Sequence, residues 1–477
     1  MTIHDLKHGD GALQRLFRSL PSVNEVLLIS ACRSLLDTHP RVTVLRATRE
    51  ILTAMRSEIS SGQHSESSLK QSISLLPKEI ANRLAVGARY SLRPVINATG
   101  VILHTNLGRA PLSPGALRHV VEVARDYCNL EYNLENGLRS RRDFHVESLV
   151  LRILGVPAAN SDRHGVTIVN NCAAATMLAL NSLAEKSEVI VSRGELVEIG
   201  GGFRIPEILE KSGAILQEVG TTNRTLLSDY ECALGPGTGL LLRVHQSNFS
   251  IEGFTERPSL KELVELSRRG GIPLFEDQGT GLLSSLERFG INGEPSLRQS
   301  FESGVDLIAA SGDKLLGGPQ CGILVGRKDL IDRIRKNPLL RALRVDKLTY
   351  AALEGTLLEH LSEETSSIPV ERMLGFRPEE LMRRCGEVAE GIYSSQLVLD
   401  IVPVASLVGG GTAPKATLQS CAISLRHKSF PAVELLSRLR KLEPPIIGRI
   451  SDDTVLLDLR TVPPDFDLEL ASLLTSL

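Results

Sequence analysis

The chain has 477 residues, enough for two or three domains, and its 42% hydrophobic and 23% charged content is ordinary for a globular protein with a sizeable core. Its formal net charge of −2 excludes a strongly basic nucleic-acid binder, so any contact with RNA must come from local basic patches. The sequence shows no secretory signal and no apolar run of about 18 residues, and its seven cysteines are scattered without a C-x-x-C pair. We therefore expect a cytoplasmic protein without a disulfide framework, a metal site, or a membrane or DNA partner.

Residues 1–75 are predicted to form a helical domain. Leu13 and Leu16 begin an apolar pattern with helical spacing, and a further helix is expected over 42–59, where several arginines lie. The stretch 60–68 reads SSGQHSESS, which is typical of a linker and predicts a hinge. The arginines either meet a phosphate-bearing partner or form a solvated helix face, and the sequence leaves both open.

From residue 165 to about residue 330, short apolar strands alternate with helical segments. This alternation predicts an α/β fold with a mostly parallel sheet and helices on both faces. Ligands of such sheets bind beyond the carboxyl ends of the strands. Asn170, His245, Asp277 and Lys314 all lie at or just beyond apparent strand ends, so we expect a ligand site there.

Lys314 lies in the run SGDKLLGGP at 311–319, between apolar strands expected at 305–310 and 321–325. A buried lysine is costly unless it is paired or used covalently, and desolvation lowers its pKa and makes the amine nucleophilic. The functional interpretation is a Schiff base with pyridoxal 5′-phosphate (PLP). The alternative is a surface lysine in a hairpin loop.

Two further features favour PLP. Asp277, at a strand end, can hold the pyridine nitrogen of the coenzyme, although an aspartate here can also be a turn or cap residue. Small residues at 170–173 open a helix directly after a strand, and the free N–H groups of a helix N-terminus suit a phosphate. The predicted cofactor-binding residues are Lys314, Asp277, Asn171, Cys172, Ala173, His245 and Ser311.

Arginines gather in two other places. A turn at 136–143 carries three of them, which suits planar binding of an anion but also fits exposed loop charge. Residues 330–365 are basic and helical. Residues 370–477 have the pattern of a smaller α+β unit.

These motifs resemble those of the bacterial selenocysteine synthase family, the L-seryl-tRNA(Sec) selenium transferases, and the resemblance covers nearly the whole chain. The matching runs are LPSV at 20–23, NATG at 97–100, HTNLGR at 104–109, SRGELVEIG at 192–200, VGTTNR at 219–224, SGDKLLGGPQ at 311–320, LRALRVDK at 340–347, IGRI at 447–450 and LLDLR at 456–460.

The resemblance implies a fold-type I PLP-dependent architecture, similar to that of aspartate aminotransferase. It implies a helical N-terminal tRNA-binding domain at 1–75, a large PLP-binding α/β domain at 76–345 and a small α+β C-terminal domain at 346–477. It also implies a homodimer with the active site at the dimer interface, and five such dimers in a ring.

The implied reaction converts seryl-tRNA(Sec) to selenocysteinyl-tRNA(Sec) with selenophosphate, through an aminoacrylyl intermediate on PLP that is bound to Lys314. Arginines of the family that match four positions here line the pocket for the phosphate group of the selenium donor. Arg341 and Arg344 are three residues apart, so one helix face is expected to present both. The expected catalytic residues are Lys314, Asp277, Arg109, Arg142, Arg341 and Arg344.

The chain departs from the usual family pattern at Gln278, Thr280, Cys172 and Lys415, which concerns pocket detail and phosphate contacts. Two other functions remain open. One is a small-molecule PLP lyase or ammonia lyase of the same fold that acts without tRNA, which the helical N-terminal unit disfavours. The other is a non-catalytic RNA-binding protein, which the intact Lys314 and Asp277 disfavour.

Overall fold

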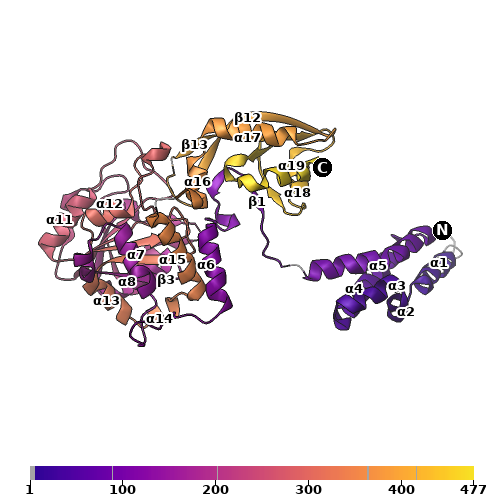
Figure 1. The fold of residues 1–477 in the computed structure, drawn as a ribbon, viewed down its shortest axis with the longest axis horizontal. Helices are drawn as coiled ribbons and strands as arrows, with labels where there is room; N and C mark the ends of the chain where they lie inside the picture. The colour runs from indigo at the N-terminus through magenta and orange to yellow at the C-terminus, as the bar shows by residue number, and fades with distance from the viewer. Residues whose placement is uncertain (1–5, 89, 201, 363–364, 415) are drawn as a thin grey trace. The chain divides into compact units, whose positions relative to one another are not determined.

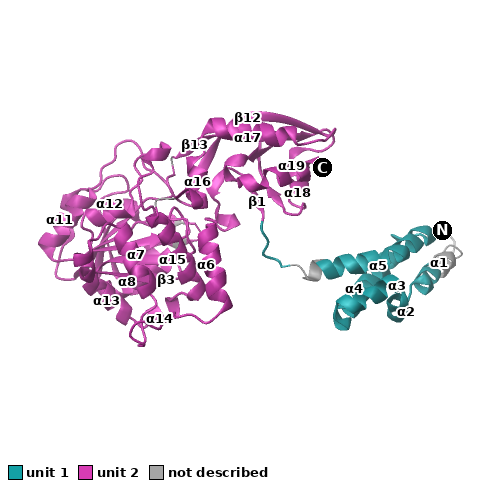
Figure 2. Cartoon of the chain, in the orientation of Figure 1, with its two compact units in different colours: residues 1–94 teal, residues 95–477 magenta. Residues whose placement is uncertain are grey.

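The computed structural model describes residues 6–88, 90–200, 202–362, 365–414 and 416–477, so the departure at Lys415 lies outside the described residues. Contacts divide the chain into two compact units, residues 1–94 and residues 95–477, which Figure 2 colours teal and magenta. Each unit has its own hydrophobic core and is described by itself.

The first unit is a group of helices around one apolar core that includes Val26, Cys32 and Leu52. Local capping helps define where the helices begin. The Ser22 hydroxyl accepts a hydrogen bond from the Glu25 backbone N–H, and the Glu25 carboxylate accepts one from the Ser22 backbone N–H. The helices are α1 (Leu6–Ser19), α2 (Val23–Leu28), α3 (Ser30–Thr38), α4 (Arg41–Ser60) and α5 (Glu66–Ala88).

The predicted hinge at 60–68 is wrong, because this stretch is a tight turn followed by the start of α5. Ile59 and Leu69, on either side of the turn, are each only 1% exposed and belong to the same core. The small polar side chains bond to nearby backbone instead, as where Ser68 Oγ accepts from the Ser65 N–H. The helical unit therefore continues beyond residue 75, to residue 94.

The second unit is built on a seven-stranded sheet with the order β3-β11-β10-β9-β8-β4-β7. Its strands pair in parallel except at β11, which runs antiparallel to both β3 and β10. Most of its central residues are buried apolar side chains, as expected for strands covered on both faces. The strands are β3 (His164–Val169), β4 (Glu188–Ser192), β7 (Ile215–Val219), β8 (Thr238–Val244), β9 (Leu274–Asp277), β10 (Leu307–Ser311) and β11 (Gly322–Arg327).

Alternate residues of these strands enter two different cores. On β4, Ile190 faces the core under one set of helices, whereas Val189 and Val191 face the other. Figure 1 shows the helices gathered around this sheet. The first set is α7 (Phe144–Ile153), α10 (Leu227–Ala233), α11 (Leu260–Gly270), α12 (Leu297–Glu302) and α15 (Lys347–Leu361), with α6 (Pro114–Arg125) against α15; the second is α8 (Cys172–Ala184), α9 (Ile205–Ser212), α13 (Lys328–Lys336) and α14 (Leu339–Leu343).

A smaller five-stranded sheet follows, with the order β15-β16-β13-β12-β2. It takes β2 from the segment before the large sheet, while α15 packs into the core of the large sheet. A segment from before the boundary expected at 345/346 therefore joins the smaller sheet, and a helix from after that boundary joins the core of the large sheet. The remaining elements are β1 (Ile96–Asn97), β2 (Val101–Leu103), β5 (Glu198–Ile199), β6 (Phe203–Arg204), α16 (Pro369–Gly375), α17 (Pro378–Glu390), β12 (Leu397–Gly409), β13 (Thr417–His427), α18 (Ala432–Leu439), β14 (Ile446–Ile447), β15 (Arg449–Ser451), β16 (Thr454–Asp458) and α19 (Asp467–Thr475).

The register of the large sheet brings several strand ends to one edge. Val244 pairs with Asp277, and Asp277 pairs with Ala309. Beyond Ser311 the chain turns and returns as β11, whose Gly322 pairs with Val169 of β3. The ends of β3, β8, β9 and β10 thus meet at the edge where the sequence places its ligand site. Among the described residues, no helix is long and apolar enough to span a membrane.

Because the helical unit has its own core, we expect residues 1–94 to fold as an isolated fragment. Leu52→Ala should lower its free energy of unfolding by about 2–5 kcal/mol, since the Leu52 side chain is 1% exposed and its loss leaves a cavity. Leu28→Ala is the matched control, because Leu28 is 68% exposed. Urea unfolding followed by circular dichroism measures both, and equal losses for the two variants would contradict the core described here.

Candidate active site

Lys314 lies in the turn between β10 and β11, at the carboxyl edge of the large sheet. The turn is held against the segment after β9, where the Leu315 N–H donates to the Thr280 carbonyl at 3.0 Å. Gly281 has a φ of +70°, and a Cβ atom there would lie 2.0 Å from the Ser311 carbonyl oxygen. Only glycine fits this close approach, so the glycine fixes the path of the chain around Lys314.

The Lys314 side chain is buried, with 5% exposure, and its amine has no hydrogen-bond partner within the part of the chain that the structure describes. Burial lowers its pKa because the ammonium form loses hydration, and Arg109 acts in the same direction. The nearby Cys172, Asp277 and Asp313 act in the opposite direction. The alternative of a surface lysine is therefore wrong, and the amine is favoured as a nucleophile or base.

Asp277 is the last residue of β9 and is buried at 4% exposure. Its carboxylate accepts a hydrogen bond from Thr176 Oγ1 at 2.9 Å and one from Cys172 Sγ at 3.5 Å, so both donors come from the first turns of α8. Burial raises the pKa of Asp277, and the bonds from Thr176 and Cys172 oppose that rise. We call these three residues the carboxylate clamp.

The departure at Cys172 has a role in this clamp. Burial raises the pKa of the Cys172 thiol well above its ordinary value, and the Asp277 carboxylate raises it further. The side chain therefore stays a protonated thiol that donates to Asp277, and it is a poor nucleophile. The expected effect of Cys172 on phosphate contacts stays a prediction.

The N-terminus of α8 lies directly after β3. Asn171 caps it, with its side-chain oxygen accepting from the Ala174 N–H at 2.8 Å. The backbone N–H groups of Cys172 and Ala173 precede the first hydrogen bonds within the helix and have no acceptor among the described residues. Such groups, together with the helix dipole, are an arrangement suited to an anion, and they lie at the same edge as Lys314.

Ser311 and Arg109 both act on Asp313, the residue before Lys314. Ser311 Oγ donates to one carboxylate oxygen at 2.9 Å, and Arg109 Nη1 donates to the other at 2.8 Å. Arg109 has a φ of 61°, the left-handed region, just after Gly108. Arg109 is thereby held near Lys314 from a segment more than two hundred positions earlier in the chain.

The remaining predicted arginines do not form one set. Arg142 Nε and Arg344 Nη1 both reach Glu131 Oε1, at 2.8 and 3.4 Å, and Arg139 binds the other oxygen at 2.7 Å. Arg341 is exposed on α14, which ends at Leu343. Arg344 follows in extended conformation, so the expectation that one helix face presents both arginines is wrong.

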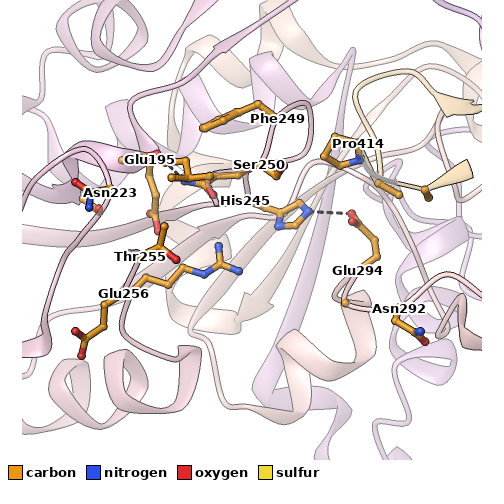
Figure 3. Close-up of a pocket in the computed structure, with 18 of the residues that line it drawn as sticks. Glu195, Asn223, His245, Phe249, Ser250, Thr255, Glu256, Asn292, Glu294 and Pro414 are labelled. Carbon is orange, nitrogen blue, oxygen red and sulfur yellow. Dashed lines mark hydrogen bonds and ion pairs between the residues drawn. The ribbon is translucent and has the colours of Figure 1, made fainter. Parts of the chain in front are cut away.

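His245 follows β8, and its backbone N–H donates to the Asp277 carbonyl at 2.9 Å. Its Nε2 bonds to Glu294 Oε1 at 2.8 Å, and this pair lines a cavity of about 650 Å³ (Figure 3). Lys314 and Asp277 do not line that cavity, so His245 is the predicted residue that connects the two places.

The departures at Gln278 and Thr280 support each other. Both are fully buried, and the Gln278 side chain donates to Thr280 Oγ1 and to the Pro295 carbonyl. Its oxygen accepts from the N–H groups of Thr280 and Gly281. These bonds fix the conformation of the turn that contacts the Lys314 segment. Because Gln278 and Thr280 bond to each other, their two departures from the family pattern are structurally linked.

Sequence reasoning did not single out Thr176, Asp313, Glu131 or Glu294. Asp313 lies inside the Ser311–Lys314 motif, and Thr176 is one helical turn after Cys172, so spacing offered a signal for both. Glu131 and Glu294 meet their partners only through tertiary contacts.

Comparison with known proteins covers both units. A family model described as L-seryl-tRNA selenium transferase matches residues 95–463, and one described as selenocysteine synthase N terminal matches residues 17–56. The chain belongs to the L-seryl-tRNA selenium transferase family. The predicted family is therefore confirmed, including its N-terminal part.

Similar relatives include two named L-seryl-tRNA(Sec) selenium transferase. The protein of Moorella thermoacetica is 45% identical over 463 residues, 96% of each chain, and that of Aquifex aeolicus is 43% identical over 453 residues, 94% of this chain and 96% of the relative.

Among solved structures, D-glucosaminate-6-phosphate ammonia-lyase aligns with a TM-score of 0.56 at 21% identity, covering 82% of this chain and 96% of that one. This likeness concerns the fold, and the predicted α/β fold-type I architecture with its mostly parallel sheet is confirmed.

The clamp predicts a role for Thr176 in holding the coenzyme of the selenium transferase family. Thr176→Val removes a donor from the buried Asp277 carboxylate, so the affinity for PLP should fall about tenfold, the effect of losing one charge-assisted hydrogen bond. Thr356→Val is the matched control, because buried Thr356 bonds only to the Ala352 carbonyl of its own helix. Equilibrium titration of the apo-proteins with PLP measures both, and equal affinities would contradict the clamp.

The unpaired amine predicts a pH-dependent cost in stability. Because folding lowers the pKa of Lys314, the unfolded chain binds more protons, and the wild-type apo-protein should gain stability as the pH rises toward the ordinary lysine value of 10.5. Lys314→Met should therefore be more stable at pH 7, by about 1 kcal/mol, with a gap that narrows by pH 9.5. Denaturant unfolding at both pH values measures it, with exposed Lys261→Met as control. A gap that widens with pH would contradict burial of the ammonium.

Proposed function

We propose that this chain is an L-seryl-tRNA(Sec) selenium transferase, which converts seryl-tRNA(Sec) to selenocysteinyl-tRNA(Sec) with selenophosphate as the selenium donor. The observation that carries the proposal is the match of both units to this one enzyme family, at 45% identity over 96% of the chain. The buried Lys314 and Asp277 supply the chemistry that such a reaction needs.

The residues at the sheet edge fit PLP. The Lys314 amine would carry the coenzyme, the Asp277 carboxylate would hold its ring nitrogen, and the N–H groups of Cys172 and Ala173 would bind its phosphate. The unpartnered amine and the two N–H groups without acceptors support this assignment. When bound, PLP supplies an electron sink for the negative charge that develops on the seryl α-carbon.

Lys314 is also placed to move protons. Its lowered pKa increases the neutral fraction of the amine near pH 7, and a neutral amine can accept the seryl α-proton. Asp313, fixed by Ser311 and Arg109, keeps a compensating negative charge beside it. The Cys172 thiol stays protonated and does not compete as a nucleophile.

Selenium replaces the seryl side-chain oxygen, and phosphate is released from selenophosphate. A multiply charged donor needs fixed cations, and Arg109, Arg142, Arg341 and Arg344 are the proposed ones. Glu131 holds Arg142 and Arg344 at one place while leaving each guanidinium further N–H donors. This arrangement supports bidentate capture of phosphate oxygens.

The helical unit is proposed to bind the tRNA, which fits its match to the N-terminal family model. We also propose a homodimer as the basic assembly, with five dimers in a ring, acting in the cytoplasm. Exposed Leu117, Val121 and Tyr127, on and after α6, offer apolar surface that a second copy can cover.

The two alternatives have less support. A small-molecule ammonia lyase shares the fold, but the likeness is 21% identity, and it does not explain the N-terminal match. A non-catalytic RNA-binding protein does not explain why a lysine amine is kept buried without a partner.

Purified holoenzyme should form selenocysteinyl-tRNA from seryl-tRNA(Sec) and selenophosphate, and Lys314→Ala should lower turnover at least about a thousandfold through loss of the coenzyme anchor and proton carrier. Selenium-75 incorporation into tRNA measures this. The control is Lys328→Ala, which removes a surface lysine paired with Asp332.

Wild-type turnover retained by Lys314→Ala would rule out the assigned role. Turnover of free serine or an amino-sugar acid, with none on seryl-tRNA(Sec), would favour the lyase.

A further inference from the structure

The cavity beside His245 lies outside the residues proposed for PLP. It is formed by the loops after β4, β7 and β8, by residues 249–251, 255–257 and 290–294, and by Ala413, Pro414 and Thr417 near the smaller sheet. Its volume of about 650 Å³ is in the range of sites for ligands much larger than a single ion. The His245 backbone N–H donates to the Asp277 carbonyl at 2.9 Å, so the cavity lies beside the strand end that carries Asp277.

Among the described residues that line the cavity, one cationic side chain has no ion-pair partner. Three carboxylates line it, and each has a partner: Glu195 binds Arg243 at 2.8 Å, Glu256 binds Arg224 at 2.7 Å, and Glu294 bonds to His245 at 2.8 Å. Arg257 also lines the cavity, and it has no ion pair or hydrogen bond within the described ranges.

The surroundings of Arg257 are unfavourable to its charge. Partial loss of hydration lowers its pKa, and Arg243 lowers it further, while Glu195 acts in the opposite direction. Glu195 is already engaged with Arg243 and with the Val244 N–H. A guanidinium in such a place is available to bind an anion from outside the chain through its N–H groups.

The neighbouring groups suit phosphoryl oxygens. Ser250 and Thr255 carry hydroxyls and line the cavity together with Arg257, and Figure 3 shows both at the cavity with Glu256 and His245. Arg224, which lines the cavity, lies over the exposed ring of Phe254, with 5.1 Å from guanidinium carbon to ring centre.

We propose that this cavity is a phosphoryl-binding subsite centred on Arg257, which receives a phosphate group of a substrate while the reacting end lies at Lys314. The inference rests on the proposed function. Two sources carry this chemistry: the terminal phosphodiester of seryl-tRNA and the free selenium donor. The volume of about 650 Å³ favours the tRNA end, because a nucleotide fills more of it than a free selenophosphate ion does.

Arg257→Gln tests the subsite, with Arg257→Lys as a second variant that keeps the charge. Arg298→Gln is the matched control, because Arg298 is an exposed arginine outside the cavity, paired with Glu302. Unchanged melting temperature and PLP absorbance establish that each variant is folded and loaded. The KM values for seryl-tRNA(Sec) and selenophosphate are measured separately, each at saturation of the other.

We expect Arg257→Gln to raise the KM for seryl-tRNA about tenfold, leaving the KM for selenophosphate and kcat near wild type. The KM for seryl-tRNA of Arg257→Lys should lie between those of the wild type and Arg257→Gln. A second measurement does not need turnover and follows the binding of a fluorescent acceptor-stem RNA that ends in CCA. Arg257→Gln should weaken this binding. It should also reduce the slope of log K against log salt concentration by about 0.7, the contribution of one phosphate contact to a single strand.

A raised KM for selenophosphate alone would keep the subsite and assign it to the free donor. Unchanged KM values with unchanged RNA binding, or equal effects of Arg298→Gln, would overturn the proposal. If the wild-type protein makes no selenocysteinyl-tRNA, the proposed function fails, while the RNA-binding arm still decides whether Arg257 contacts a phosphate.

Discussion

A lysine amine kept away from water, with no hydrogen-bonding partner among the described residues, is the constraint on which the rest of the active site depends. Burying the charged form of Lys314 costs free energy. This cost is offset when the amine forms a covalent bond or an ion pair. The sheet makes the burial possible, because β10 and β11 pass on either side of the turn and Gly281 lets the next segment approach within contact distance. The lowered pKa of Lys314 is a consequence of this placement.

Helix α8 ties the parts of this site into one frame. Its N-terminal N–H groups have no acceptor among the described residues and suit an anion, and its first turns supply Cys172 and Thr176 to the Asp277 carboxylate. A ligand anchored at both places is therefore oriented by a single rigid element rather than by separate loops. The cavity lined by His245 begins one residue beyond β8, whose Val244 pairs with Asp277, so it lies at the same sheet edge.

Local pattern was enough to predict the features that depend on sequence spacing. Strand–helix alternation predicted the mostly parallel sheet, and small residues after β3 predicted the N-terminus of α8. Features that depend on distant contacts were not predictable this way. Arg344 reaches the loop that holds both Glu131 and Arg142 from more than two hundred positions away. Among the described residues, the lack of an ion-pair partner for Arg257 is evident only once every neighbouring carboxylate has its own. The exact ends of helices were also not predictable from the sequence. Arg344 lies one residue past the end of α14, so it does not share a helix face with Arg341 as predicted.

The most direct test of the coenzyme assignment is to reduce the holoenzyme with borohydride, digest it, and identify by mass spectrometry the lysine that carries a pyridoxyl group. The structure predicts that the label is on Lys314, in the peptide that spans the turn between β10 and β11. A label on another lysine, or a protein that takes up no coenzyme at all, would contradict it.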